Sequence, residues 1–227
     1  MSQKRENVHN FLNHLRKDFA YRTFVFSGLS FCATVLFAGY NLFLGIAYGA
    51  AWNICICVYF VCLALLRAYV IVSEHRAFAV KDGEGEKRRA RAFFVQSVSL
   101  FAVDLALVAP ISLMVMQDRT VEYSAIPAIT IAAYTTYRIV LSARNFFKAR
   151  SQGNAGVKML RNINLMDALV SVLSLQYTLV MTFGDGVDGE MLPLCAVTSF
   201  AVWAFLVGFS VRIVWVALRE LRAVRRA

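Results

Sequence analysis

Long apolar segments, separated by short charged ones, dominate the pattern of this chain. Arg22 and Arg67 enclose 44 residues without a charge. A helix crosses a hydrocarbon core with about 20 residues, so this run holds two spans. Glycine permits a tight turn, and the sequence GIAYG at 45–49 divides the run. The same pattern along the chain predicts six spans, at approximately 22–44, 51–73, 92–116, 123–143, 162–184 and 191–217.

Composition excludes most soluble classes of protein. Of the 227 residues, 59% are apolar and 17% are charged, whereas a soluble domain carries about a quarter charged residues. The longest internal connection, 74–91, is too short for a soluble catalytic or nucleotide-binding domain. The chain has no P-loop, no dinucleotide-binding glycine pattern and no zinc-site spacing. We therefore expect an all-α membrane protein without cofactor or metal, and not an enzyme.

The charges predict how the spans are oriented. The net charge is +10, and of the lysines and arginines only Arg119 lies away from one side of the predicted spans. The positive-inside rule places that side, with both termini, in the cytoplasm. Topology thus accounts for the basic excess, and we expect no nucleic-acid partner. The organisation is then cytoplasmic segments at 1–21, 74–91, 144–161 and 218–227 around hairpins at 22–73, 92–143 and 162–217.

Two of the cytoplasmic segments have features of their own. Segment 1–21 is basic, with apolar residues at helical spacing, which is typical of a helix lying on the membrane surface; a frayed tail is the alternative. The run Lys87, Arg88, Arg89 and Arg91 (KRRAR) would attract anionic lipid headgroups.

Two independent features recur with nearly one period. Arg67, Arg138 and Arg212 are separated by 71 and 74 residues, each near the same end of the second helix of a hairpin. Polar stripes at offsets 0, 4, 7 and 11 recur on the first helices. These stripes are Thr23, Ser27, Ser30 and Thr34; Phe93, Ser97, Leu100 and Asp104; and Asp167, Ser171, Ser174 and Thr178. We interpret this as three parallel hairpin repeats related by a pseudo-threefold axis; chance similarity among membrane helices is the alternative.

Asp104 is the most informative single residue. It lies about 18 Å into its span, near the bilayer midplane, where a carboxylate costs a few kcal/mol. Pro110 follows on the same helix and leaves the carbonyl of Ala106 without its donor, which predicts a kink. Asp104 is either a proton, cation or polar-solute site, with Ser97 on its face, or an aspartate that holds helices together. Among the deep tyrosines, Tyr134 is the expected partner.

Asp167 begins a second polar face and lies about one turn from the predicted cytoplasmic interface. The face continues through Ser171, Ser174 and Thr178 and suits a wet lining or a close helix contact equally. Arg67, Arg138 and Arg212 are interpreted first as anchors that reach the interface. With a true threefold axis they would instead form an arginine ring at the cytoplasmic mouth.

The segments ALVSVLSLQYTLVMTFG (168–184) and AAYTTYR (132–138) resemble an uncharacterised family of bacterial six-span membrane proteins. The resemblance extends over most of the chain. It implies a bacterial inner (plasma) membrane location and a single membrane domain, and it supplies no activity and no site residues.

Three functions remain open from the sequence. The first is a channel or transporter for protons, cations or a small polar solute, with a path between the odd-numbered spans and Asp104 at its centre. The second is an assembly, sensory or accessory protein whose polar stripes contact its own copies or another membrane protein. The third is a lipid-modifying enzyme at the interface using Asp167, which is disfavoured because clustered acids or a nucleophile with its base are missing.

Overall fold

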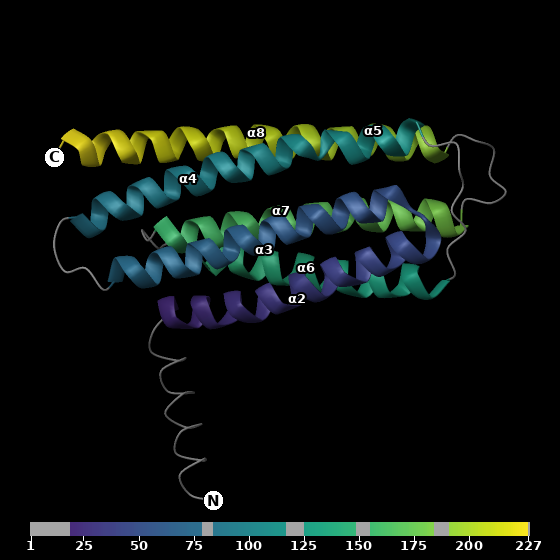
Figure 1. The fold of residues 1–227 in the computed structure, drawn as a ribbon, viewed down its shortest axis with the longest axis horizontal. Coiled ribbons are helices and arrows are strands. Elements are labelled where there is room, and N and C mark those ends of the chain that lie inside the picture. The colour runs from purple at the N-terminus through teal and green to yellow at the C-terminus, as the bar shows by residue number, and fades with distance from the viewer. Residues whose placement is uncertain (1–18, 79–83, 117–124, 149–154, 184–190, 227) are drawn as a thin grey trace, which may run out of the picture.

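The computed structural model describes residues 19–78, 84–116, 125–148, 155–183 and 191–226. All regular structure in these residues is α-helical (Figure 1). The prediction of an all-α chain with six spans is confirmed, with the third span divided into two helices. The helices are α2 (Phe19–Tyr48), α3 (Ala51–Phe78), α4 (Glu84–Ala106), α5 (Val108–Met116), α6 (Ala125–Lys148), α7 (Ala155–Phe183) and α8 (Met191–Arg226).

The six spans are long and apolar enough to cross a membrane, as a multi-pass membrane protein requires. Large apolar side chains lie on the outside: Leu36 on α2 is 75% exposed and Ile126 on α6 is 72% exposed. Many polar side chains are buried inside, among them Asp104 and Asp167. An apolar exterior suits contact with lipid tails. Buried ionisable side chains are the first candidates for functional residues in a membrane protein.

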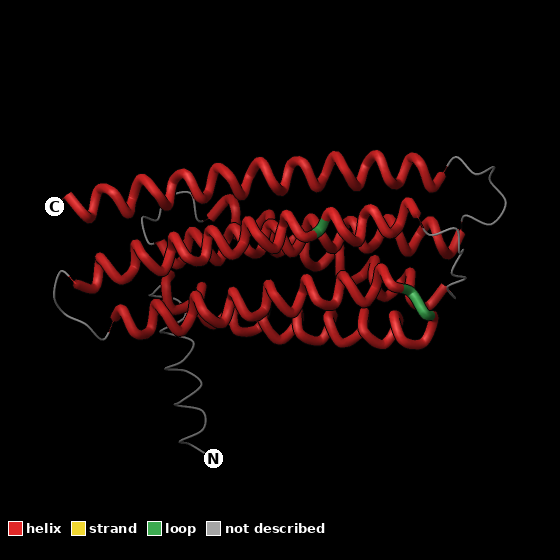
Figure 2. Tube along the Cα trace, turned by 45° about the horizontal axis from the view of Figure 1, so that its top comes forward, coloured by secondary structure: helices red, strands yellow, loops and turns green. Residues whose placement is uncertain are grey.

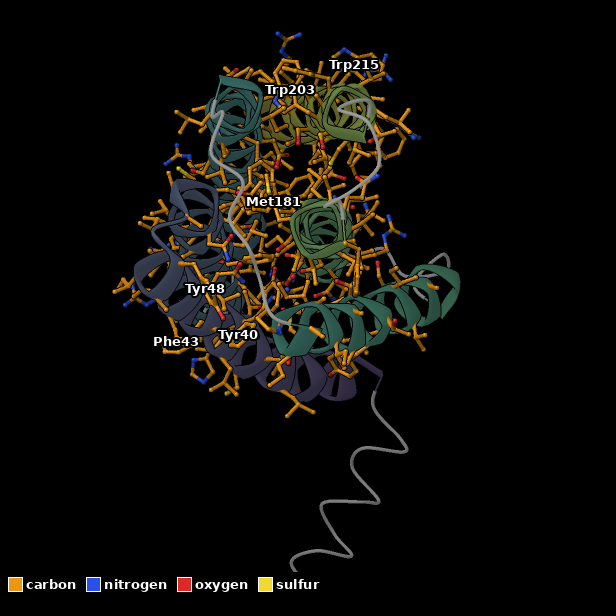
Figure 3. All side chains as sticks on the ribbon, turned by 90° about the vertical axis from the view of Figure 1, so that its right-hand side faces the viewer. Tyr40, Phe43, Tyr48, Met181, Trp203 and Trp215 are labelled. Carbon is orange, nitrogen blue, oxygen red and sulfur yellow. The ribbon has the colours of Figure 1, made fainter. Side chains whose placement is uncertain are left out.

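The fifth span, α7, lies at the centre of the bundle and is the most buried of the six. In the end-on view of Figure 3, the other helices are arranged around it, while Phe43 projects outward from α2. Contacts to α7 come from α2, α3, α4, α6 and α8. Any side chain on the inner face of α7 is therefore enclosed by protein on several sides.

The first hairpin packs as expected, with α2 against α3. Gly49 adopts φ +66° in the connection, and Gly45 lies so close to Ile54 that a Cβ at Gly45 would be 2.6 Å from its Cγ1. The tight turn predicted from GIAYG is thus present, and these two glycines are the residues it requires.

The remaining spans do not pack chiefly within their predicted hairpins. Among the described residues, α4 packs most extensively against α8, and α6 against α7, whereas α4 and α6 form no substantial contact. Figure 1 shows α4, α5 and α8 grouped on one side of α7, with α2, α3 and α6 grouped on the other. The threefold repeat and the orientation of the termini stay predictions.

The third span breaks at Leu107, between α4 and α5 (Figure 2). Pro110 has no backbone N–H for the carbonyl of Ala106, so the α-helical hydrogen-bond ladder is interrupted there. At the break, the N–H of Leu107 donates to the carbonyl of Asp104, three residues earlier, over 3.3 Å. The predicted kink is present, three residues before the proline.

Several helices extend beyond their predicted ends. Helix α3 continues to Phe78 and α4 begins at Glu84, so most of the segment expected as a loop over 74–91 is helical. Lys, Arg and Glu are good helix formers, so a span continues as a helix beyond the hydrocarbon core. The basic run that begins at Lys87 consequently lies on the first turns of α4.

Candidate functional site

Two arginines and one aspartate from three helices meet inside the bundle. Nη2 of Arg67 on α3 lies 3.1 Å from Oδ2 of Asp167 on α7, and Nη2 of Arg138 on α6 lies 2.6 Å from the same oxygen. The side chains of Arg67 and Asp167 are 0% exposed, and that of Arg138 is 1% exposed. We call these three residues the arginine–aspartate cluster. With all three groups ionised, two positive charges face one negative charge.

Neutral side chains complete the surroundings of both guanidinium groups. Nη1 of Arg67 donates to the hydroxyls of Ser30 and Thr34 on α2, over 2.9 Å each. Arg138 donates to the same two hydroxyls, with Nη1 2.5 Å from that of Ser30. Oδ1 of Asn164 accepts from Nη2 of Arg67 over 2.8 Å. Helix α2 thus bridges the two arginines, whose like charges repel one another.

The cluster lies near the middle of the three helices that carry it. Arg67, Arg138 and Asp167 each lie within about three residues of the midpoint of their helices, or about 5 Å along the axis. The interpretation of Arg67 and Arg138 as anchors that reach the interface is wrong, because both side chains are buried inside the bundle against Asp167. Asp167 is likewise far from the end of α7, which begins at Ala155.

Arg212 does not join the other two arginines. It is exposed on α8, whereas Arg67 and Arg138 are buried. The structure therefore brings together two members of the expected arginine ring and leaves the third on the outer surface.

Tyr134 belongs to this cluster and not to Asp104. Its hydroxyl accepts from Nε of Arg138 over 2.7 Å and lies 3.5 Å from Oδ1 of Asp167. The expected pairing of Tyr134 with Asp104 is wrong, because α6 packs on α7 and away from α4.

Asp104 has a separate site, which its α4 shares with α3 and α8. Oδ1 of Asp104 accepts from the hydroxyl of Tyr59 over 2.9 Å, and Oδ2 accepts from the hydroxyl of Ser210. The indole Nε1 of Trp203 donates to the backbone carbonyl of Asp104 over 3.0 Å. Asp104 is 0% exposed, and no cation forms a salt bridge with it in the described part of the chain. Trp203 lies between the ribbons of α5 and α8 in Figure 3.

Comparison with protein-family models, curated proteins and solved structures finds no match for this chain.

The polar face of α7 is buried and mostly satisfied by the helix itself. The hydroxyl of Ser171 donates to the carbonyl of Asp167 over 2.6 Å, and that of Thr178 donates to the carbonyl of Ser174 over 2.9 Å. The carbonyl of Ser171 also accepts from the hydroxyl of Thr135 on α6 over 3.0 Å. On α4, the buried hydroxyl of Ser97 donates to its own helix as well. These neutral hydroxyls bond to backbone carbonyls, whereas the ionisable side chains in this part of the bundle are those of the arginine–aspartate cluster.

The ends of the bundle carry ordinary surface charges. Lys87, Arg88 and Arg91 are exposed on α4, while Arg89 reaches Glu74 on α3, with Nε 3.8 Å from Oε2. The predicted amphipathic character of 1–21 lies outside the described residues, apart from the start of α2. No group of three or more His, Cys, Asp or Glu in the described ranges could hold a metal ion.

Three residues of the Asp104 site were not singled out from the sequence. Tyr59, Trp203 and Ser210 carry no local pattern that points to Asp104, because they come from spans distant in sequence. Asn164 lies on the polar face of α7, one turn before Asp167. That spacing was the available indication that an amide would accompany the carboxylate.

Proposed function

We propose that this protein is a membrane transporter or channel for a small polar solute, with the arginine–aspartate cluster as its central binding site. The observation that carries the proposal is the burial of Arg67, Arg138 and Asp167 near the middle of three helices. Ionisable side chains inside a membrane are costly, and they mark solute or ion pathways when they are retained.

A purely structural role explains this arrangement less well. Replacing a buried ion pair by well-packed apolar residues is often neutral or stabilising, so packing alone does not call for three ionisable groups. The second arginine adds a further cost, because Asp167 neutralises only one of the two. A bound solute that interacts with both guanidinium groups gives a reason to keep them.

The Asp104 site is a second buried polar site, at a different position along the bundle. Tyr59, which donates to Asp104, and Arg67 lie eight residues apart on α3, about 12 Å along the helix. A solute path from one site to the other would follow the inner face of α3, next to α7. This path differs from the one expected between the odd-numbered spans, because the partners of both aspartates come largely from even-numbered spans.

A second candidate function is assembly with another membrane protein. It is favoured by the polar contacts that hold α7 to its neighbours, namely Thr135 to Ser171 and Gln176 to Thr198. Under this candidate the interior is dry, and enlarging Ser171 or Thr178 lowers stability without any solute flux to lose.

The location follows from the charge pattern and the resemblance. We place the protein in a bacterial inner membrane with both termini in the cytoplasm, because, of the lysines and arginines, only Arg119 lies away from one side of the predicted spans. The exposed side chains of Lys87, Arg88 and Arg91 at that end suit contact with anionic lipid headgroups.

Osmotic swelling of proteoliposomes tests the proposal across several classes of solute. Purified protein is reconstituted, and light scattering is followed in potassium acetate, chloride and nitrate with valinomycin, in potassium sulfate, and in glycerol and glycine. We expect at least one solute to enter faster than into empty liposomes. Arg67→Gln should lower that rate by about tenfold or more, since it removes charge-assisted hydrogen bonds.

Arg212→Gln is the matched control, because it removes an arginine that is exposed on α8. Its swelling rate should equal that of the native protein. The proposal fails if no solute enters faster than into empty liposomes, or if a folded Arg67→Gln variant retains the native rate.

A further inference from the structure

The ionic groups of the cluster do not balance. Arg67 and Arg138 both reach Oδ2 of Asp167, and no other carboxylate of the described residues forms an ion pair with either. Asp104, the other fully buried acid, lies in the separate site with Tyr59. The formal charge of the cluster, two minus one or +1, is therefore carried by side chains that are buried inside the bundle. An excess charge in such a place favours binding of a mobile counter-charge.

The hydrogen-bond donors of the cluster also exceed its acceptors. Nε of Arg67 is buried and no acceptor of the described chain meets it. The hydroxyl of Ser30 already accepts from both guanidinium groups. An unpartnered N–H on a guanidinium is a donor for an acceptor-rich ligand, and its burial excludes bulk water from that role.

Asp167 shows which chemistry fits between the arginines. One carboxylate oxygen accepts from both guanidinium groups, at 3.1 and 2.6 Å. Guanidinium groups are suited to carboxylates by their planar set of donors. A ligand with one negative charge would bring the cluster to neutrality, whereas a dianion would leave it negative.

We propose that the cluster is a binding site for a small monovalent anion, of the size of acetate, chloride or nitrate, held by Arg67 and Arg138 beside Asp167. This inference rests on the proposed function for its biological meaning, because it names the class of solute that the central site receives.

Thermal unfolding of the purified protein in an uncharged detergent tests the site directly. Sodium acetate, chloride or nitrate replaces sodium sulfate at constant ionic strength, and intrinsic fluorescence gives the midpoint of unfolding. Since sulfate itself stabilises folded proteins, each shift is compared with that of a variant in the same buffers. The native protein should show a saturable rise with the monovalent anion relative to Arg138→Gln.

Substitutions change the charge of the cluster in opposite directions, so their predicted effects differ in sign. Arg138→Gln brings the formal charge to zero and should weaken the apparent anion affinity by about tenfold or more. Asp167→Asn brings it to +2 and should enlarge the anion-dependent rise. Arg212→Gln should behave as the native protein. If Arg138→Gln does not fold, Arg67→Gln makes the same change of charge.

The inference is overturned if native protein and Arg138→Gln respond equally to the anions, or if Asp167→Asn gains no more from them than native protein. Its failure is distinguishable from failure of the proposed function. Anion-dependent stabilisation without solute flux would contradict the transport function and support the anion site. Swelling in glycerol or glycine without anion-dependent stabilisation would support transport and contradict the anion site.

Discussion

Phe37 of α2 stacks on Tyr134 of α6, with ring centroids 3.7 Å apart and ring planes 7° apart. This stack positions the tyrosine ring whose hydroxyl accepts from Arg138. It therefore connects packing between two spans that are distant in sequence to the geometry of the arginine–aspartate cluster.

Phe37→Leu should lower the free energy of unfolding by about 1 kcal/mol, because the aromatic stack is lost while most of the apolar volume is kept. Phe43→Leu on the same helix is the control, since Phe43 is 63% exposed toward the outside. Denaturation with sodium dodecyl sulfate in mixed micelles measures both. Equal losses for the two variants would show that the stack has no special role.

The charges of the cluster predict a rescue between two substitutions. Asp167→Asn leaves two buried guanidinium groups without a counter-ion, and in sulfate buffer it should cost about 3–5 kcal/mol. Adding Arg138→Gln removes one of these charges and should recover part of that loss. A double variant as unstable as the sum of the single changes would contradict electrostatic coupling between the two residues.

The turn between α2 and α3 predicts a difference between two glycines of α2. A Cβ at Gly45 would lie 2.6 Å from Cγ1 of Ile54 and 3.2 Å from its backbone nitrogen, whereas a Cβ at Gly39 meets nothing within 4 Å. Gly45→Ala should destabilise by about 1–3 kcal/mol. Gly39→Ala should be neutral or slightly stabilising, since alanine favours the helix. Thermal unfolding that ranks the two variants in the opposite order would disprove this close approach.

The Asp104 site predicts coupling across α3 and α4. Tyr59→Phe removes the donor 2.9 Å from the carboxylate and should cost about 1 kcal/mol. In the double variant with Asp104→Asn, the loss of unfolding free energy should differ from the sum of the two single losses by about 0.5 kcal/mol or more. Tyr69→Phe is the control, because Tyr69 is exposed on the same helix and should add independently. Additivity in both pairs would mean that Tyr59 does not act through Asp104.

Features that depend on one helix or one turn could be predicted from the sequence. The six spans follow from apolar run length, the turn from Gly45 and Gly49, and the break near Leu107 from Pro110. Asp104 was expected to need a polar partner or site inside the bundle, because a carboxylate facing lipid is too costly. Asp167 was expected near the cytoplasmic interface, at the start of a polar face.

Features that depend on contacts between distant helices could not be predicted. Arg67 and Arg138 lie inside the predicted spans 51–73 and 123–143, and an arginine near the end of a span is usually an anchor that reaches the interface. Only the packing of the helices shows that both side chains are buried. The joint role of these arginines at Asp167 required the packing of α6 on α7 and of α3 on α7. The similar sequence spacing of Arg67, Arg138 and Arg212 suggested one common role. In the structure the first two are buried and Arg212 is exposed.

The relative importance of the two aspartates tests the central claim most directly. Swelling rates are measured for Asp167→Asn and Asp104→Asn, each normalised to the amount of folded protein in the liposomes. The cluster as central site predicts that Asp167→Asn changes the rate in the best-transported anion by about tenfold or more, while Asp104→Asn changes it less. A larger effect of Asp104→Asn, or no effect of Asp167→Asn, would contradict the account.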